Sequence, residues 1–344
     1  MSLARVADEP TREEWRRLYE AALAYRACAP WQWLSDVDLF GVRDPVSGEI
    51  GWCSVFGAAG ELFGLFVYAG SEGLATYLRM AGGDLDSDEL PYIQQGWLAT
   101  FEDRPTLDKR DLATIKALGL AVRGRRAWPR FRSHRSGYVP WYLTGDEARF
   151  LTVALGQAAA VATRFRDAVV ALGPDAAGRF LVRVAEPESV GVRWEDRRLA
   201  PPPVPLAEPA PPMDQARVDR VRRAATLGPG TWECDAFYSP AIIDDGQGRP
   251  FFAPSVLLVD RDSGMILDAR FGEPPLAAPF IRDRLLSAIE TIGTRPRVVL
   301  TKGDRVLDAL GPLAGALEVR VERARRLPAL EQARRSMESF LQRR

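Results

Sequence analysis

A run of thirteen residues, 123–135, carries the densest group of side chains that could bind a ligand. Six arginines are interleaved there with Trp128, Phe131 and His134. Guanidinium groups make paired hydrogen bonds to phosphate, and aromatic rings stack on nucleic-acid bases. Composition offers a second explanation, because the chain has three lysines and arginine fills nearly every other basic position. The run therefore indicates either an anion or single-strand contact or an ordinary arginine-rich surface, and its arginines are Arg123, Arg125, Arg126, Arg130, Arg132 and Arg135.

Two further groups of residues could carry chemistry. Asp36 and Asp38 alternate with apolar residues, which predicts two carboxylates on one face of a strand. Such a pair occurs in acid/base or metal sites and equally on the wet face of an antiparallel sheet. Four tryptophans in or beside apolar segments predict either core packing or a ligand-stacking pocket: Trp31, Trp33, Trp52 and Trp97.

Residue counts argue against several classes of mechanism. The chain has one histidine, His134, and three cysteines that are too far apart for a zinc finger. No nucleophile motif surrounds that histidine, so a serine or cysteine hydrolase is not expected. Neither a GxGxxG nor a P-loop pattern follows a predicted strand, which argues against a dinucleotide or ATP cofactor.

Charge and hydropathy bear on partners and compartment. The 46 basic and 46 acidic residues cancel, so no overall field attracts nucleic acid or an anionic membrane. Apolar stretches fall far short of the roughly 20 residues of a membrane-spanning helix. Scattered cysteines are typical of a reducing compartment. We expect a cytoplasmic protein without a membrane partner.

The 344 residues correspond to about two domains. Seven prolines fall between residues 200 and 213, where no regular hydrogen-bonded element could form. The prediction is an N-terminal α+β domain over 1–199, a proline-rich linker over 200–213 and a C-terminal α/β domain over 214–344.

Hydrophobic periodicity supplies the elements of both domains. In the N-terminal part it predicts a helix over 11–27 that starts with a Thr11–Glu14 capping box, then strands over 36–42, 50–56 and 62–68 in an antiparallel meander. In the C-terminal part it predicts a strand over 231–238, then a hairpin, then helices alternating with strands up to a final helix over 328–341. The fold class is α+β, with a mixed sheet in the C-terminal domain.

Several motifs resemble those of a family of uncharacterised two-domain bacterial proteins. They lie within Trp31–Phe40, Tyr68–Gly73, Phe101–Arg104 and Trp128–Trp141, and in the second half within Trp232–Asp235 and Leu258–Gly264. Both halves of that family are catalogued as domains of unknown function. The resemblance covers most of the chain except the linker, and it implies no activity.

The C-terminal order of elements is also similar to the RNase H-like fold of nucleases and transposases. The resemblance implies two metal ions, Mg²⁺ or Mn²⁺, held by acids on the first strand, after the fourth strand and on a late helix. Asp235, Asp304 and Glu338 occupy those places. Lys302 beside Asp304, and Arg334 four residues before Glu338, are instead typical of a solvated surface with ion pairs.

We therefore predict a binding or regulatory protein without evident catalysis and without a cofactor. Its partner is unidentified, and a protein or an anionic ligand is expected ahead of nucleic acid. The alternative is a metal-dependent, RNase H-like phosphodiester-cleaving domain that uses Asp235, Asp304 and Glu338.

Overall fold

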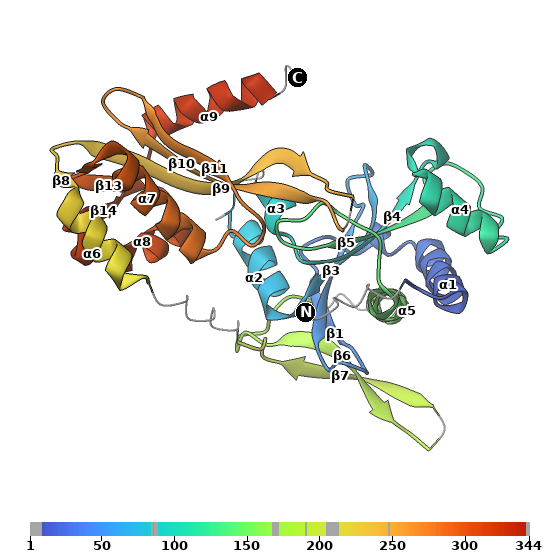
Figure 1. Ribbon diagram of the computed structural model, residues 1–344. Coiled ribbons are helices and arrows are strands. Elements are labelled where there is room, and N and C mark those ends of the chain that lie inside the picture. The colour runs from blue at the N-terminus through green and yellow to red at the C-terminus, as the bar shows by residue number, and fades with distance from the viewer. Residues whose placement is uncertain are drawn as a thin grey trace. The chain divides into compact units, whose positions relative to one another are not determined.

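A computed structural model describes residues 9–83, 85, 89–166, 172–189, 191–203, 213–246 and 248–341. The chain separates into two units (Figure 1), of which unit 1 is Met1–Arg135 with Pro140–Pro205 and unit 2 is Ser136–Val139 with Leu206–Arg344. Both combine sheets with helices, so the predicted α+β class is confirmed. Most of the predicted linker, residues 204–212, lies outside the described part of the chain.

Unit 1 is built on a seven-stranded sheet in the order β5-β4-β3-β2-β1-β6-β7. Strands β1 to β5 form an antiparallel run, β6 joins it parallel to β1, and β7 returns antiparallel to β6. The predicted meander is thus confirmed and extended. The strand bounds are β1 Phe40–Arg43, β2 Ile50–Phe56, β3 Phe63–Ala69, β4 Gly96–Glu102, β5 Trp128–His134, β6 Phe180–Pro187 and β7 Val192–Leu199.

Helices cover both faces of this sheet. On one face lie α1 (Arg12–Cys28) and α5 (Gly145–Phe165), whose apolar sides pack on buried residues such as Val55 and Phe101. On the other face α2 (Gly70–Ala81) packs on Trp52 and its neighbours. The shorter elements of the unit are the 3₁₀ turns η1 Pro30–Gln32 and η2 Arg104–Thr106 and the helices α3 Leu90–Ile93 and α4 Lys109–Ala117.

The predicted capping box at the start of α1 is confirmed. The Thr11 hydroxyl accepts from the Glu14 amide at 3.3 Å, and the Glu14 carboxylate accepts from the Thr11 amide at 2.7 Å. The two bonds satisfy amides that would otherwise lack partners in the first turn.

The sequence prediction starts the first strand too early. The observed strand β1 begins at Phe40, not at Asp36. The Asp38 carboxylate accepts from the amide and the hydroxyl of Ser35 at 2.8 and 2.9 Å. An aspartate that bonds to the nearby chain in this way stabilises a turn instead of a strand. Asp36 and Asp38 therefore do not form a carboxylate pair on a strand face.

Unit 2 contains a five-stranded sheet in the order β11-β10-β9-β13-β14. The first three strands in sequence pair antiparallel, and β13 lies parallel to both β9 and β14. The mixed sheet and the succession of elements along the chain agree with the sequence prediction, and the structure adds the strand order, which is that of the RNase H-like fold. The bounds are β9 Thr231–Ile243, β10 Phe251–Asp260, β11 Ile266–Phe271, β13 Val298–Thr301 and β14 Arg320–Arg323, with a separate parallel pair of β8 Thr226–Leu227 and β12 Thr294–Arg295.

Four helices surround this sheet: α6 Gln215–Ala224, α7 Ala278–Ile292, α8 Asp304–Leu317 and α9 Pro328–Leu341. Figure 1 shows α9 on one face of the sheet and α7 and α8 on the other. Leu257 and Val259 pack with Leu330 of α9 on one face of the sheet, and Glu233, which pairs with Val259 across the strands, is fully buried and accepts the Leu330 amide at 2.9 Å near the start of α9. A strand side chain thus caps a helix that follows it by almost a hundred residues.

Within the described ranges, every helix is too short or too polar to cross a lipid bilayer.

Candidate functional site

Unit 1 has a pocket of about 430 Å³ where four segments of the chain meet. The end of α1, the turn η1, the start of β3 and the loop before β5 each contribute side chains. Its lining consists of three arginines, two aromatic residues and one alanine: Arg26, Arg125, Arg126, Trp31, Phe63 and Ala29. We call it the arginine–aromatic pocket.

Two residues of this pocket have a left-handed backbone. Ala29 has φ 50° and Arg126 has φ 48°, and they are two of the three described non-glycine residues with positive φ. Ala29 ends α1, and its amide donates to the Tyr25 and Arg26 carbonyls at 3.2 and 3.1 Å. A left-handed non-glycine residue costs about 1–3 kcal/mol and is concentrated at ligand sites in many proteins.

Hydrogen bonds fix the arginine loop beside the end of α1. Asp103 accepts the Arg126 amide at 2.7 Å, and its other carboxylate oxygen lies 3.8 Å from Arg125 Nε. Arg26 Nε donates to the Arg126 carbonyl at 3.0 Å, and Arg126 Nη1 donates to the Gly60 carbonyl. A guanidinium has five N–H donors, and these hydrogen bonds use one on Arg26 and one on Arg126. The three groups thus carry more positive charge and more donors than Asp103 offsets.

Two aromatic rings lie beside these guanidinium groups. The ring centroids of Trp31 and Phe63 are 4.8 Å apart, and the Arg126 guanidinium lies 5.5 Å from the Phe63 centroid. Gly57 has φ 133°, and a Cβ there would lie 2.6 Å from Phe63 and 3.0 Å from Trp31. The close approach of the two rings therefore requires glycine at this turn. Cations next to flat apolar rings suit an anion that carries a flat apolar part.

The structure places the six sequence-predicted arginines in different surroundings. Arg125 and Arg126 line the pocket, whereas Arg123 is exposed and outside its lining. Arg130 on β5 lies 3.9 Å from Glu102. Arg135 is exposed just after β5, and Arg132 is buried.

Arg132 belongs to a buried polar cluster between β5 and α4. Its guanidinium donates to both carboxylate oxygens of Asp111 at 3.0 and 2.8 Å and to Asp108 at 2.6 Å. The Tyr142 hydroxyl also donates to Asp108, at 2.8 Å. Arg132 is therefore held by two carboxylates of its own domain, and it does not line the arginine–aromatic pocket.

The pocket also includes residues that the sequence did not indicate. Arg26, Ala29 and Phe63 carry no local signal, because they lie up to a hundred residues from Arg125 and only the fold brings them together. Trp31 was predicted as either a core or a ligand-stacking residue, and it lies in the pocket. Trp33 instead donates to the Ala162 carbonyl at 3.1 Å, and Trp52 is fully buried.

The sequence-predicted acids of unit 2 lie on three elements. Asp235 is on β9, where its carboxylate accepts the Ala236 amide at 2.8 Å. Asp304 begins α8 and forms an ion pair with Arg323. Glu338 is on α9, and its side chain lies outside the described part of the structure, so the triad as a whole stays a prediction. Among the described side chains, no group of three or more His, Cys, Asp or Glu could hold a metal ion.

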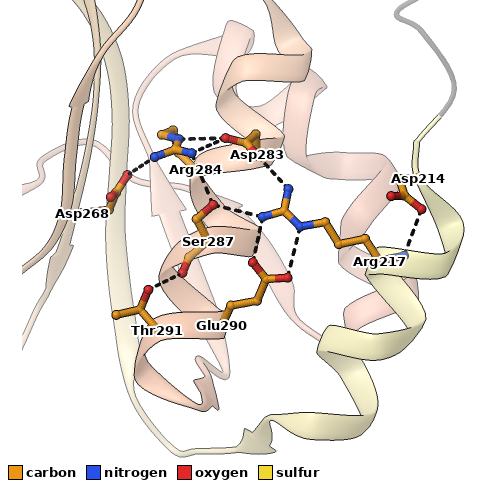
Figure 2. Close-up of polar contacts among 8 residues, drawn as sticks. All are labelled: Asp214, Arg217, Asp268, Asp283, Arg284, Ser287, Glu290 and Thr291. Carbon is orange, nitrogen blue, oxygen red and sulfur yellow. Dashed lines mark hydrogen bonds and ion pairs between the residues drawn. The ribbon is translucent and has the colours of Figure 1, made fainter.

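A second polar cluster in unit 2 joins α6 to α7 (Figure 2). Arg217 donates to both carboxylate oxygens of Glu290 at 3.1 and 2.8 Å and to Asp283 at 2.6 Å. The hydrogen bonds to Glu290 and then to Asp283 raise the pKa of Arg217, and the same contact lowers the pKa of Glu290. Arg284 links this cluster to Asp268 on β11 at 3.7 Å. These contacts dock α6 onto α7.

Comparison with known proteins identifies the two halves as domains. Residues 15–183 match a domain of unknown function (DUF7309), and residues 217–338 match a second domain of unknown function (DUF6930). No curated protein matches the chain.

Solved structures similar to the chain include viral integrase and transposase proteins. The BIV integrase catalytic core domain is 14% identical, with 33% of this chain and 68% of that chain covered and a TM-score of 0.26. The HTLV-2 integrase catalytic core domain is 12% identical, with 35% and 73% covered and a TM-score of 0.26. The Mos1 strand transfer complex is 15% identical, with 77% and 71% covered and a TM-score of 0.22.

The RNase H-like description of unit 2 rests on its strand order, not on these matches. The two domain matches, in turn, confirm the resemblance to a two-domain family of unknown function. The chain thus carries a match to DUF7309 followed by a match to DUF6930.

Proposed function

We propose that the protein is a binding protein and that its DUF7309 domain holds an anionic ligand in the arginine–aromatic pocket. One observation carries the proposal: Arg26, Arg125 and Arg126, from segments a hundred residues apart, converge on one pocket of about 430 Å³. That volume lies within the usual range of small-molecule sites, about 300–1,000 Å³. Three guanidiniums beside one carboxylate favour a ligand with negative charge.

The backbone of the pocket supports the same proposal. Ala29 and Arg126 adopt left-handed conformations that glycine would adopt at lower cost. Asp103 and Arg26 hold the Arg126 peptide through its amide and its carbonyl. The loop is therefore held in a fixed conformation before a ligand arrives, which reduces the entropy lost on binding.

Isothermal titration of the full-length protein with inorganic phosphate and pyrophosphate tests this proposal. Arg125→Ala removes a guanidinium that is 81% exposed and should weaken binding about tenfold or more. Arg123→Ala is the matched control, because Arg123 is exposed on the same loop but does not line the pocket, and its affinity should stay within about twofold of wild type. Absence of binding to the wild type, or an equal loss in both variants, would reject the proposal.

The strand order of unit 2 is the observation that favours a second function, metal-dependent phosphodiester cleavage. Fold alone does not determine activity, however. Asp304 forms an ion pair with Arg323, and the Glu338 side chain lies outside the described part of the structure, so a site built on Asp235, Asp304 and Glu338 stays a prediction. Cleavage of a labelled single strand in Mn²⁺ that is lost in Asp235→Asn would support this second function over the first.

A further inference from the structure

We infer that the ligand of the arginine–aromatic pocket is a 5′-nucleotide, whose base stacks on Trp31 and Phe63 while its phosphate meets Arg125 and Arg126. The inference rests on the proposed function and adds the chemical class of the ligand. The same chemistry is offered by a free nucleoside monophosphate and by the 5′-phosphorylated end of a single strand.

The composition of the lining is the first reason. A site for a bare inorganic anion needs N–H donors and gains little from apolar rings. This pocket places Trp31 and Phe63 next to the guanidiniums, with ring centroids 4.8 Å apart. Both rings are partly exposed, so part of each remains open to a flat group of the ligand.

The turn chemistry is the second reason. The backbone at Gly57, at φ 133°, lets Phe63 and Trp31 approach more closely than any side chain at that position would allow. The rings of Tyr25 and Phe101 also lie 6.0 and 5.8 Å from Trp31 and support the indole. Proteins that bind nucleotides without sequence preference stack the base on an aromatic ring beside a cationic group, with no hydrogen bonds to the edge of the base.

The polar groups of the pocket explain which part of the nucleotide is recognised. Asp103 accepts the Arg126 amide and lies 3.8 Å from Arg125 Nε. The Gly60 carbonyl accepts from Arg126. These acceptors are already used by the protein, so the lining favours phosphate over a particular base. We therefore expect all four nucleoside 5′-monophosphates to bind with affinities within about fivefold of one another.

Isothermal titration of the full-length wild type with three ligands separates the two levels of the proposal. The ligands are a nucleoside 5′-monophosphate, ribose 5-phosphate and inorganic pyrophosphate. The monophosphate should bind about tenfold or more tightly than ribose 5-phosphate, because stacking of a base contributes that much. Equal affinities for these two would overturn the nucleotide inference and leave the anion-binding proposal standing, and no binding by any of the three would overturn both.

Two variants test the ring contact. Trp31→Leu should lose the preference for the monophosphate over ribose 5-phosphate while affinity for pyrophosphate stays within about threefold, since the arginines remain. Trp31→Tyr keeps an aromatic ring, so it should keep at least part of that preference and shows the effect even if Trp31→Leu does not fold. A preference that survives in folded Trp31→Leu would contradict the inference.

Oligonucleotide arms identify the source of the nucleotide. The experiment compares three ligands: a ten-nucleotide thymidine strand with a 5′-phosphate, the same strand without it, and free thymidine 5′-monophosphate. Binding of the phosphorylated strand at least as tight as that of the monophosphate assigns the pocket to strand ends. Binding of the monophosphate alone assigns it to free nucleotides.

Discussion

Arg126 combines a side chain that lines the arginine–aromatic pocket with a backbone conformation that suits glycine. Its φ of 48° costs about 1–2 kcal/mol in a residue with a Cβ. Arg126→Gly relieves this cost but loses the guanidinium contacts with Gly60 and Phe63. We expect a free energy of unfolding within about 1 kcal/mol of wild type, together with at least a tenfold loss of pyrophosphate affinity.

Urea unfolding and isothermal titration of Arg126→Gly measure both effects. A loss of stability above about 2 kcal/mol would show that the side chain is structural. Retained affinity would show that Arg126 does not contact the anion.

Arg132 illustrates the opposite case, a guanidinium with a purely structural role. Its side chain is 7% exposed and that of Asp111 is 9% exposed, so removal of the cation leaves a buried carboxylate without its partner. Arg132→Met should lower the free energy of unfolding by about 3–5 kcal/mol. On the same strand, Arg130→Met removes a looser pair with Glu102 at 3.9 Å and should cost less than about 1 kcal/mol. Denaturant unfolding of the two variants at pH 7 provides the comparison, and equal costs would contradict it.

Asp108 makes stability depend on pH. Burial raises the pKa of Asp108, but hydrogen bonds from the Asp111 amide and the Tyr142 hydroxyl, with the charge of Arg132, together hold it below its usual value of 3.8. A carboxyl whose pKa is lower in the folded state stabilises the fold above its unfolded pKa and loses that contribution as pH falls through the folded value. Stability should therefore decline below about pH 4, and less steeply in Asp108→Asn than in wild type. Unfolding free energies at pH 7, 5 and 3.5 test this, and identical slopes would contradict it.

At the level of elements, Arg217 is the polar contact that docks α6 onto α7 (Figure 2). The helix also buries Val218 and Val221, so the loss of one side chain should loosen α6 without unfolding unit 2. Arg217→Met should speed amide hydrogen exchange in α6 and cost about 1–2 kcal/mol. Arg223→Met is the control, because Arg223 Nε bonds to the Asp219 carbonyl of its own helix. Exchange in α6 that is no faster in Arg217→Met than in this control would contradict the docking role.

The sequence predicted those elements that a nearby turn residue or a clear periodicity marks. The hairpin of β10 and β11 was predicted, and its turn at Arg261–Gly264 has a local signal: Gly264 has φ 70° and Asp260 accepts the Ser263 amide at 2.9 Å. The bounds of α9 were predicted correctly, because Pro328 opens a strongly amphipathic segment. The strand β5 was missed, since its arginines concealed an alternation in which Phe131 is buried in the core.

The pocket could be predicted only in part, for a related reason. Arg125 and Arg126 belong to a visible sequence cluster, and Trp31 stood among the candidate ligand-stacking tryptophans. Arg26 is one arginine of an ordinary amphipathic helix, and its position at the pocket depends on where α1 ends. The sequence placed that end within one residue, at 27 against Cys28, but it did not show that β3 and the loop before β5 would meet Arg26 there.

At the level of the whole molecule, the balance of 46 basic and 46 acidic residues determines how any strand must bind. No net field attracts a polyanion, so binding depends on local contacts. Each phosphate contacted by a single strand contributes about −0.7 to the slope of log K against log salt concentration.

The salt dependence of strand binding therefore distinguishes a pocket from a track of arginines. Arg132 is held by Asp108 and Asp111, and Arg130 lies beside Glu102, so the six arginines of 123–135 cannot act as one continuous surface. A pocket that contacts one or two phosphates gives a slope of about −0.7 to −1.4, whereas six contacts would give about −4. Titrations of a 5′-phosphorylated thymidine strand between 50 and 300 mM salt should show the shallow slope, and Arg125→Ala should reduce it further. A slope steeper than about −3 would mean that the strand is bound along the surface of the domain, and the pocket would then not be the site of recognition.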